Sequence, residues 1–346
     1  MIDNTKNQKF FIKSFGCQYN EWDASKLSFI LKNLGLIEST QNDAEIIFLL
    51  NCSVRKTGVD RAMSFAKNFI KAGKKVFVSG CILDRDKKIF TEKGVTIWNA
   101  ENIDELIEYL GIVKDENILK EILSSSQKST NLIPIMKGCN NFCSYCAVPY
   151  TRGREISRPQ EDIIADVKKV ISANHKEIWL LGQNVNSYEF GFADLLRKIN
   201  AIPGDFVVYF TSNHPKDMTD DIIEAIATLP KIAKAIHLPL QSGSNKILKA
   251  MNRPYSKEKY LSIIEKIKKE IPEVKISTDT IIGFPGETED DFQKTVEIIK
   301  SVKFSQVFNN KYSPREGTFA FKLGDPIPWS EKERRWRILN DITNKH

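Results

Sequence analysis

The repeated succession of strand and helix signals is the feature of this 346-residue sequence that most limits its fold. Short apolar runs, rich in β-branched and aromatic residues, alternate with longer segments whose apolar residues recur at helical spacing. This alternation is typical of parallel sheets, because a helix carries the chain back between neighbouring strands. We therefore predict an α/β protein built from parallel strands.

Residues 1–123 predict an N-terminal parallel-sheet domain. Its expected strands cover 9–16, 44–51, 74–80 and 94–98. Its expected helices cover 20–35, 55–72 and 102–111, of which the first begins at a capping Asn20 and ends at Gly35. The polar stretch "SSSQKSTN" at 124–131 lacks apolar periodicity, so we expect a linker there.

Residues 132–328 predict a second domain in which the alternation repeats six times. The expected strands are 132–138, 177–183, 205–212, 235–242, 275–284 and 305–313. Helical patterns lie between them, including 159–174, 219–229, 256–270 and 288–302. Six units favour a partial (βα)6 barrel over a complete barrel of eight. The charged stretch 329–346 predicts a terminal helix.

Composition narrows the setting in which the chain works. Apolar residues make up 41% of it, enough for a large core, and no leader or apolar run of about 18 residues stands out. We therefore expect a cytoplasmic protein that does not enter a membrane. The net charge of +7 is compatible with an anionic partner such as nucleic acid.

Three of the six cysteines crowd into the stretch "GCNNFCSYC", at Cys139, Cys143 and Cys146. They follow the first strand of the second domain, where a barrel carries its active site. Three thiolates suit a 4Fe–4S cluster that leaves one iron open for chemistry. A zinc site, which prefers four closed ligands, and a disulfide or unliganded cysteines are the alternatives, and the spacing favours the cluster.

The remaining cysteines, Cys17, Cys52 and Cys81, each lie directly after one of the first three strands of the N-terminal domain. The carboxyl ends of parallel strands meet at one edge of the sheet, so these thiols should converge. A second cluster is one interpretation. The alternative is that each is a small buried residue at the end of a strand.

The stretch "GCNNFCSYCAVPYTRGREISRP" at 138–159 resembles the radical S-adenosylmethionine (SAM) methylthiotransferases. Further segments resemble the N-terminal domain of that family ("GCQYNEWDASK", "NCSVR", "VSGC") and its catalytic core ("LLGQNVNSY", "HLPLQSGSNKILKAMNR", "DTIIGFPGETEDDF", "YSPREGT"). The resemblance runs from about residue 9 to 340. It is strongest to the MiaB type, which acts on N6-isopentenyladenosine at position 37 of tRNA.

The sequence departs from the family pattern in three places. The chain ends where the RNA-binding TRAM domain of MiaB-type enzymes would begin. Asn213 stands in "SNHP", where a serine is usual, and "GCILDRDKK" replaces a more typical stretch after Cys81.

The resemblance implies two 4Fe–4S clusters with different tasks. Cys139, Cys143 and Cys146 would hold the cluster that binds and reductively cleaves SAM, giving a 5′-deoxyadenosyl radical that abstracts hydrogen from C2 of the base. Cys17, Cys52 and Cys81 would hold an auxiliary cluster that delivers sulfur, and a second SAM would methylate that sulfur. The cofactors would supply the difficult chemistry and the protein their placement.

The same resemblance suggests residues that contact SAM and the substrate. The expected SAM contacts are Tyr145, Gly182, Gln183, Gln241, Ser242, Pro285 and Gly286. Arg152, Arg154 and Arg158 would bind the SAM carboxylate or tRNA phosphate. The structural alternatives are that Gly182 relieves crowding, that Tyr145 shields the cluster from water, that Gln241 and Ser242 form a polar turn, that 284–288 is a plain turn into a helix, and that the arginines are solvated. The basic stretch 331–338 predicts either an RNA contact or a helix packed on the barrel.

The resemblance also implies partners and competing activities. The expected partners are tRNA and an electron donor of the flavodoxin or ferredoxin type, and we expect a monomer. The alternative substrates are threonylcarbamoyladenosine in tRNA and a ribosomal-protein aspartate. A protein that only transfers electrons between two clusters is a different class, and the segments at 180–188 and 284–288 argue against it.

Overall fold

The computed structural model describes residues 7–53, 56–100, 102–112 and 130–343. By internal contacts the chain divides into two compact units, residues 1–132 and 133–346. Within the described ranges, no helix is long and apolar enough to cross a membrane. Apart from Thr130 and Asn131, the linker predicted at 124–131 lies outside the described residues.

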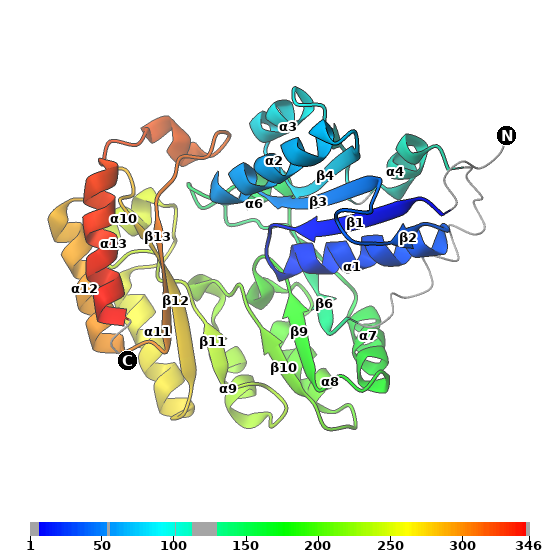
Figure 1. Ribbon diagram of the computed structural model, residues 1–346. Coiled ribbons are helices and arrows are strands. Elements are labelled where there is room, and N and C mark those ends of the chain that lie inside the picture. Colours follow the sequence, from blue (N-terminus) through cyan, green and yellow to red (C-terminus); the bar gives the residue numbers. More distant parts are fainter. Residues whose placement is uncertain (1–6, 54–55, 101, 113–129, 344–346) are drawn as a thin grey trace. The chain divides into compact units, whose positions relative to one another are not determined.

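The first unit holds a sheet of five parallel strands in the order β2-β1-β3-β4-β5 (Figure 1). The strands are β1 (Lys9–Ser14), β2 (Ile37–Glu38), β3 (Ile46–Cys52), β4 (Lys75–Cys81) and β5 (Thr96–Ile97). The helices are α1 (Gln18–Asn33), α2 (Lys56–Lys71), α3 (Asp84–Thr91) and α4 (Ile103–Leu110). The sequence pattern did not predict β2 or α3, both of which are short.

The central strand β3 is apolar on both of its faces because helices cover both sides of the sheet. Ile46, Phe48 and Leu50 pack with residues of α1 and α4, whereas Ile47 and Leu49 pack with residues of α2 and α3. An unbroken apolar run is expected for a parallel strand buried on two faces. Figure 1 shows α1 and α2 on opposite sides of this sheet.

In the second unit the six predicted core strands are β6 (Leu132–Pro134), β9 (Glu177–Leu181), β10 (Val207–Phe210), β11 (Ala235–His237), β12 (Lys275–Ile282) and β13 (Gln306–Lys311). They form two three-stranded sheets, β10-β9-β6 and β11-β12-β13. A parallel bridge between Val208 and Ile232, just before β11, brings the two sheets together. The strands thus follow one another in chain order, as a partial barrel requires. The predicted fold class is confirmed.

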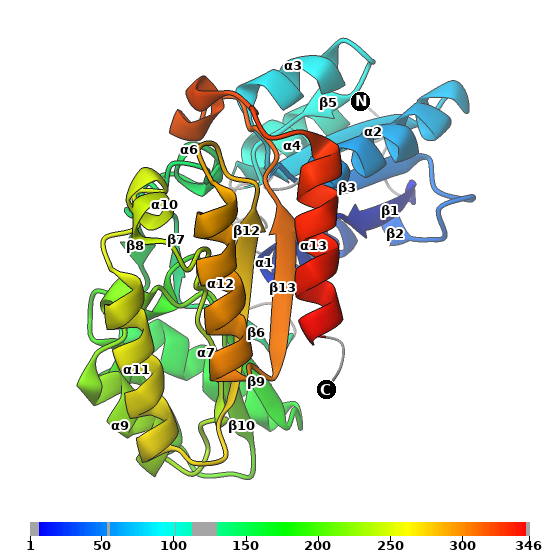
Figure 2. The same cartoon turned by 90° about the vertical axis from the view of Figure 1, so that its left-hand side faces the viewer.

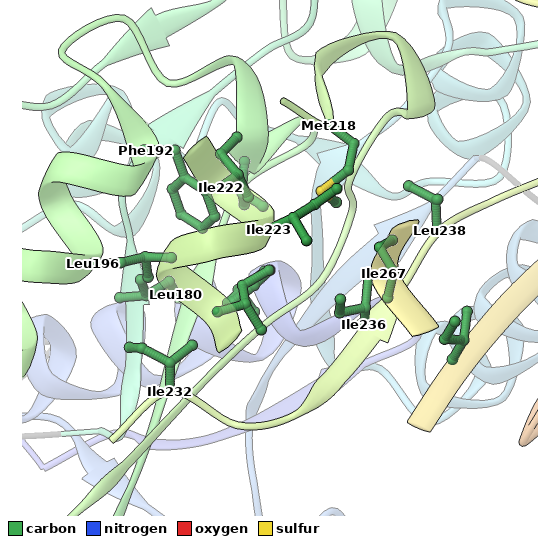
Figure 3. Close-up of a cluster of buried hydrophobic side chains, with 14 of the residues drawn as sticks. Leu180, Phe192, Leu196, Met218, Ile222, Ile223, Ile232, Ile236, Leu238 and Ile267 are labelled. Atoms are coloured by element: carbon green, nitrogen blue, oxygen red, sulfur yellow. The ribbon is translucent and has the colours of Figure 1, made fainter. Parts of the chain in front are cut away.

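The helices of this unit are α6 (Val148–Thr151), α7 (Gln160–Ser172), α8 (Phe192–Asn200), α9 (Asp220–Thr228), α10 (Asn245–Ala250), α11 (Lys257–Glu270), α12 (Glu289–Val302) and α13 (Trp329–Thr343). Three short 3-10 helices are η1 (Val185–Ser187), η2 (Pro215–Asp217) and η3 (Phe319–Leu323). Figure 2 shows α11, α12 and α13 side by side against the strands. Figure 3 shows part of the core, where Phe192 and Leu196 lie near Leu180 and Ile222.

The first core strand differs from its prediction because it changes partners midway. The sequence predicts one strand over 132–138, whereas β6 stops at Pro134 and a new strand, β7 (Met136–Lys137), pairs antiparallel with β8 (Ile156–Ser157). Between the two strands, the Ile135 N–H donates to Leu181 and its carbonyl accepts from Arg158. A pairing of two residues on each side is too short to leave an alternating pattern in the sequence.

The terminal helix α13 packs on the barrel through apolar residues such as Leu339 and Trp336 and also through two buried cations. Arg335 is buried, and its Nη1 lies 2.7 Å from the Glu287 carboxylate, which also accepts from the Gly283 N–H. Lys332 is buried against Tyr312, with Asp325 as its ion-pair partner. The structure therefore favours the packed helix over the RNA contact for this stretch.

The Arg335–Glu287 pair predicts a large and non-additive effect on stability. Arg335→Met leaves a buried carboxylate without its cation and should lower the free energy of unfolding by about 3 kcal/mol. Adding Glu287→Gln restores neutrality and should recover part of this loss, because the new amide oxygen can still accept from Gly283. Urea unfolding followed by fluorescence measures both values. If the free energy of unfolding of Arg335→Met lies within about 1 kcal/mol of the parent value, the argument from burial is contradicted.

Candidate functional site

The three core cysteines lie on a loop, 138–155, whose ends are joined by the β7/β8 pair. The Cys139 N–H donates to the Gly153 carbonyl at 3.2 Å. Gly138 has a φ of +74°, and a Cβ placed there would lie 2.0 Å from the Arg154 carbonyl oxygen. Glycine at 138 is thus needed both for the backbone angle and for the close approach of the two ends of the loop.

A second segment, distant in sequence, holds the middle of the cysteine loop. The Ser144 N–H donates to Met251 at 2.9 Å and its Oγ donates to Ala250 at 2.8 Å. Asn252 returns a hydrogen bond from its Nδ2 to the Phe142 carbonyl at 3.0 Å. On its other side, the Ser144 carbonyl accepts from Ala320 in η3. The loop is therefore clamped between the end of α10 and η3.

The thiols of this loop lie in a low-polarity environment and interact with one another. Cys139, Cys143 and Cys146 carry free thiols, and the first two are buried. Burial raises the pKa of Cys146 to about 12, and the neighbouring Cys143 contributes to the rise. Burial also raises the pKa of Cys139. The structure thus brings the three predicted ligands together, as thiols that a metal centre would have to deprotonate.

Nowhere in the described ranges do three His, Cys, Asp or Glu side chains form a group that could hold a single metal ion. A zinc ion binds each sulfur at ~2.3 Å and so needs its thiolates nearly in contact. In an iron–sulfur cluster each thiolate binds a different iron, so the ligands stand farther apart. A donor set of three thiols suits a cluster with one open iron better than a closed zinc site, because structural zinc prefers four ligands.

A buried arginine lies beside the cysteine loop. Arg253 directs Nη1 toward the Cys143 sulfur at 3.4 Å, while its Nε donates to the Tyr255 hydroxyl. A buried cation beside the Cys143 thiol fits a centre whose ligands become thiolates when it binds. Sequence analysis did not identify Arg253, because the residue lies 110 positions from Cys143.

Buried polar atoms without partners gather at the carboxyl ends of three successive strands. Counting the described residues only, the atoms are Gln183 Oε1 and Asn184 Oδ1 after β9, Asn213 Oδ1 and His214 Nε2 after β10, and Gln241 Oε1 after β11. Buried polar groups in native proteins are almost always hydrogen-bonded. Five such atoms on one rim indicate a place for a polar ligand.

The rim offers one donor and four acceptors. His214 Nδ1 accepts from the Lys216 N–H, so in the neutral ring the proton lies on Nε2. Burial first, and then Arg253 and Lys216, lower the pKa of His214 to about 2, which keeps the ring neutral. The other four atoms are amide oxygens. Such a rim suits a ligand with several N–H and O–H donors.

Backbone strain marks the same rim. Ser212 and Gln241 both have a φ of +65°, which non-glycine residues rarely adopt. Two backbone hydrogen bonds hold Gln241 in this conformation: its N–H donates to the Asp279 carbonyl, and its carbonyl accepts from the Ile281 N–H. Strained residues at strand ends are typical of ligand sites.

Of the other predicted SAM contacts, two are accounted for by packing or internal hydrogen bonds. A Cβ on Gly182 would lie 2.6 Å from Met136 Cγ and 3.0 Å from Val185 Cγ1, so packing gives this position a reason to be glycine, and its contact with SAM stays a prediction. The Ser242 Oγ accepts from the Ser244 N–H. Tyr145 packs against the apolar cluster that includes Ile247 and Phe284, and burial raises its pKa well above the ordinary value.

The turn from Gly283 to Thr288 contains the remaining predicted SAM contacts, Pro285 and Gly286. Pro285 is buried, and the Gly286 carbonyl accepts from Lys246 at 2.8 Å. Because Glu287 ties the turn to α13, its shape is fixed within the unit. Its contact with SAM stays a prediction.

The three predicted substrate arginines differ in their surroundings. Arg158 is tied to the Pro134 carbonyl and, at 2.7 Å, to Asp166. Arg154 is exposed and stacks on Phe142 at 4.2 Å from the ring centre. Arg152 is half-buried on the cysteine loop. Arg154 thus keeps the greatest freedom to meet an anionic ligand.

In the first unit the loops that carry Cys17, Cys52 and Cys81 are joined by hydrogen bonds. Cys52 and Cys81 are register partners on β3 and β4. The Ser53 N–H donates to the Cys81 carbonyl at 2.7 Å. Asn20 connects the third loop: its N–H donates to Cys17, and its Nδ2 donates to the Asn51 carbonyl at 2.7 Å. The sheet edge therefore gathers all three cysteine-bearing loops.

Asn51, directly before Cys52, has features that are typical of a ligand site. Its side chain is 0% exposed, and neither Oδ1 nor Nδ2 has a partner within the described chain. Next to it, Gly80 has a φ of +99°, and a Cβ there would lie 2.6 Å from the Asn51 carbonyl. A buried amide without partners, beside converging thiols, fits a bound group that supplies them.

The comparisons with known proteins agree with this geometry. Residues 133–299 match the radical SAM superfamily, and residues 9–98 match the uncharacterized protein family UPF0004. Among solved structures, TsrM, a radical SAM methyltransferase from Kitasatospora setae, has a TM-score of 0.63 at 10% identity, covering 88% of this chain and 75% of its own. OxsB, a cobalamin-dependent SAM radical enzyme, has a TM-score of 0.60 at 13% identity, covering 99% and 56%. The second unit thus defines a radical SAM enzyme.

Curated relatives narrow the family further. A tRNA-2-methylthio-N(6)-dimethylallyladenosine synthase from Clostridium botulinum (strain Langeland) is 42% identical over 99% of this chain and 84% of its own length. A synthase of the same name from Clostridium beijerinckii is 42% identical over 97% and 80%. The chain belongs to this family of transferases, which confirms the resemblance noted in the sequence.

The link between the loops of the first unit predicts a stability effect with a matched control. Asn20→Ala removes the hydrogen bond to the buried Asn51 carbonyl and should lower the free energy of unfolding by about 1–3 kcal/mol. Asn33 lies in the same helix, but it is exposed and bonds only to Phe29, so Asn33→Ala should change stability by less than about 0.5 kcal/mol. Denaturant titration compares them. Equal losses would show that Asn20 has no special role.

Proposed function

We propose that this protein converts N6-isopentenyladenosine at position 37 of tRNA into its 2-methylthio derivative, using two 4Fe–4S clusters and two molecules of SAM. The names of the curated relatives contain the product, 2-methylthio-N(6)-dimethylallyladenosine in tRNA, and N6-isopentenyladenosine is the same nucleoside without the methylthio group. The observation that carries the proposal is the distribution of the six cysteines as two sets of three, each at the carboxyl edge of its own parallel sheet.

In the second unit, Cys139, Cys143 and Cys146 would hold the first cluster, and the rim after β9, β10 and β11 would hold SAM. SAM has an ammonium group, two ribose hydroxyls and an adenine amino group, all of which donate hydrogen bonds. The unpaired oxygens of Gln183, Asn184, Asn213 and Gln241 are complementary acceptors. A protein that only carries electrons would have no use for such a rim.

In the first unit, Cys17, Cys52 and Cys81 would hold the auxiliary cluster. Asn20 and Ser53 would keep the three loops in register, and the Asn51 amide would face the bound group. When bound, the core cluster supplies the electron that cleaves SAM, and the auxiliary cluster supplies the sulfur that is methylated. The surrounding side chains exclude water and fix the positions of the ligands.

We propose tRNA as the macromolecular partner, an electron donor of the flavodoxin or ferredoxin type, and a monomer as the working form. The net charge of +7 favours association with a polyanion. Arg154 and Arg152 on the cysteine loop are the candidate phosphate contacts.

The division of tasks predicts different losses for the two cysteine sets. After anaerobic reconstitution, Cys17→Ala should abolish methylthio transfer and remove about half of the bound iron, while cleavage of SAM to 5′-deoxyadenosine continues. Cys143→Ala should abolish both activities, because no SAM-cleaving centre remains. Iron analysis, chromatography of 5′-deoxyadenosine and nucleoside mass spectrometry give the three readouts.

The substrate is tested in the same assay with tRNA carrying either isopentenyladenosine or threonylcarbamoyladenosine. We expect product only from the first. Full methylthio transfer by Cys17→Ala would contradict the proposal of two clusters. Product formed only from tRNA with threonylcarbamoyladenosine would contradict the proposal that isopentenyladenosine is the substrate.

A further inference from the structure

Arg253 occupies an unusual place for a permanently charged side chain. The residue is 7% exposed and lies just after α10, in the segment that clamps the cysteine loop. Its Nε donates to the Tyr255 hydroxyl at 2.9 Å, its Nη2 to the Pro239 carbonyl at 3.1 Å, and its Nη1 points to Cys143 Sγ at 3.4 Å. Each part of the guanidinium is thus directed at a specific atom.

None of these partners carries a charge that balances the guanidinium. Across the described ranges, no Asp or Glu forms an ion pair with Arg253, whereas the equally buried Arg335 has Glu287 at 2.7 Å. The ionisable groups that interact electrostatically with Arg253 include Cys143, Cys146, Tyr145, Tyr255, Tyr260 and His214, none of which is a carboxylate. Burial of an unpaired charge is strongly unfavourable, so a negative group is expected there in the working protein.

The position of Arg253 relative to Cys143 is set by the backbone. Ser144 bonds to both Ala250 and Met251, and Asn252, with a φ of +55°, bonds back to Phe142. These contacts join the residues on either side of Cys143 to the residues just before Arg253. The clamp therefore fixes the Arg253 backbone near Cys143, and the bonds from Nε to Tyr255 and from Nη2 to Pro239 hold the guanidinium beside the sulfur.

We propose that Arg253 is a positioning residue for the core cluster: it donates a charged hydrogen bond to the Cys143 thiolate and raises the reduction potential of the cluster. This inference rests on the proposed cluster at the three core cysteines. A fixed positive charge stabilises the reduced form, which has one more negative charge, more than it stabilises the oxidised form. Hydrogen bonds to ligand sulfur act in the same direction.

The test is a redox titration with dithionite, followed by electron paramagnetic resonance, in protein whose auxiliary cysteines Cys17, Cys52 and Cys81 are replaced by alanine. Arg253→Gln should shift the one-electron equilibrium at least tenfold toward the oxidised form, a fall of about 59 mV. Arg253→Lys keeps the charge and should shift it less. Arg197→Gln, which removes a surface arginine paired with Asp221, should leave the potential unchanged.

A measurement without substitution at Arg253 guards against a variant that does not fold. Pulsed electron paramagnetic resonance on the same protein, labelled with 15N-arginine, should detect coupling between the reduced cluster and a guanidinium nitrogen. An unlabelled sample provides the blank.

Two results would overturn the inference: an unchanged potential in Arg253→Gln, or the absence of 15N coupling. If the alanine-substituted parent binds no cluster at all, the proposed function fails as well. A parent that binds the cluster, with Arg253 variants identical to it, overturns only the role of Arg253.

Discussion

The parallel direction of the strands is the constraint on which both sites depend. In each unit the strands of the parallel sheets end at one edge, so residues that follow different strands are brought together although they lie far apart in sequence. Cys52 and Cys81 meet as register partners in this way. Gln183 follows β9 and Gln241 follows β11, which are strands of the two sheets that together form the partial barrel. Their unpaired oxygens therefore lie on the same rim of the second unit.

Hydrogen bonds between loops then fix what the strands bring together. In the first unit Asn20 and Ser53 join the three cysteine-bearing loops, and in the second Ser144 binds both the end of α10 and η3. Loops at a sheet edge would otherwise be free to vary in position. Glycines at 80 and 138 allow the required close approach of backbones, since a Cβ at either position would collide with a carbonyl oxygen.

Buried charge is used in two different ways in the second unit. Arg335 and Lys332 are paired with carboxylates and hold α13 and the turn at Gly283 in place, so their role is structural. Arg253 has no such carboxylate within the described residues, and its partners are the Tyr255 hydroxyl, the Pro239 carbonyl and the Cys143 sulfur. The presence or absence of a paired carboxylate thus distinguishes Arg335, which stabilises the fold, from Arg253, which lies beside the proposed cluster.

The sequence was sufficient to predict the α/β fold, the six core strands and the places of all six cysteines, because strand periodicity and the edge rule are local signals. It could not predict β7 and β8, which are two residues long, or the clamp from Ser144 to Ala250, which spans 106 positions. Asn184, His214 and Arg253 were not predicted as site residues either, because their roles depend on contacts between residues far apart in sequence. Gly182 was predicted to contact SAM, which stays a prediction; the structure adds close contacts with Met136 and Val185 that the sequence did not reveal.

The central claim, that each set of three cysteines holds its own cluster, is tested most directly by Mössbauer spectroscopy. The full chain, reconstituted anaerobically with 57Fe, should show signals of two [4Fe–4S] clusters per chain. Replacement of Cys17, Cys52 and Cys81 together should remove one of the two and leave the other unchanged. A single cluster in the unsubstituted chain would contradict the account.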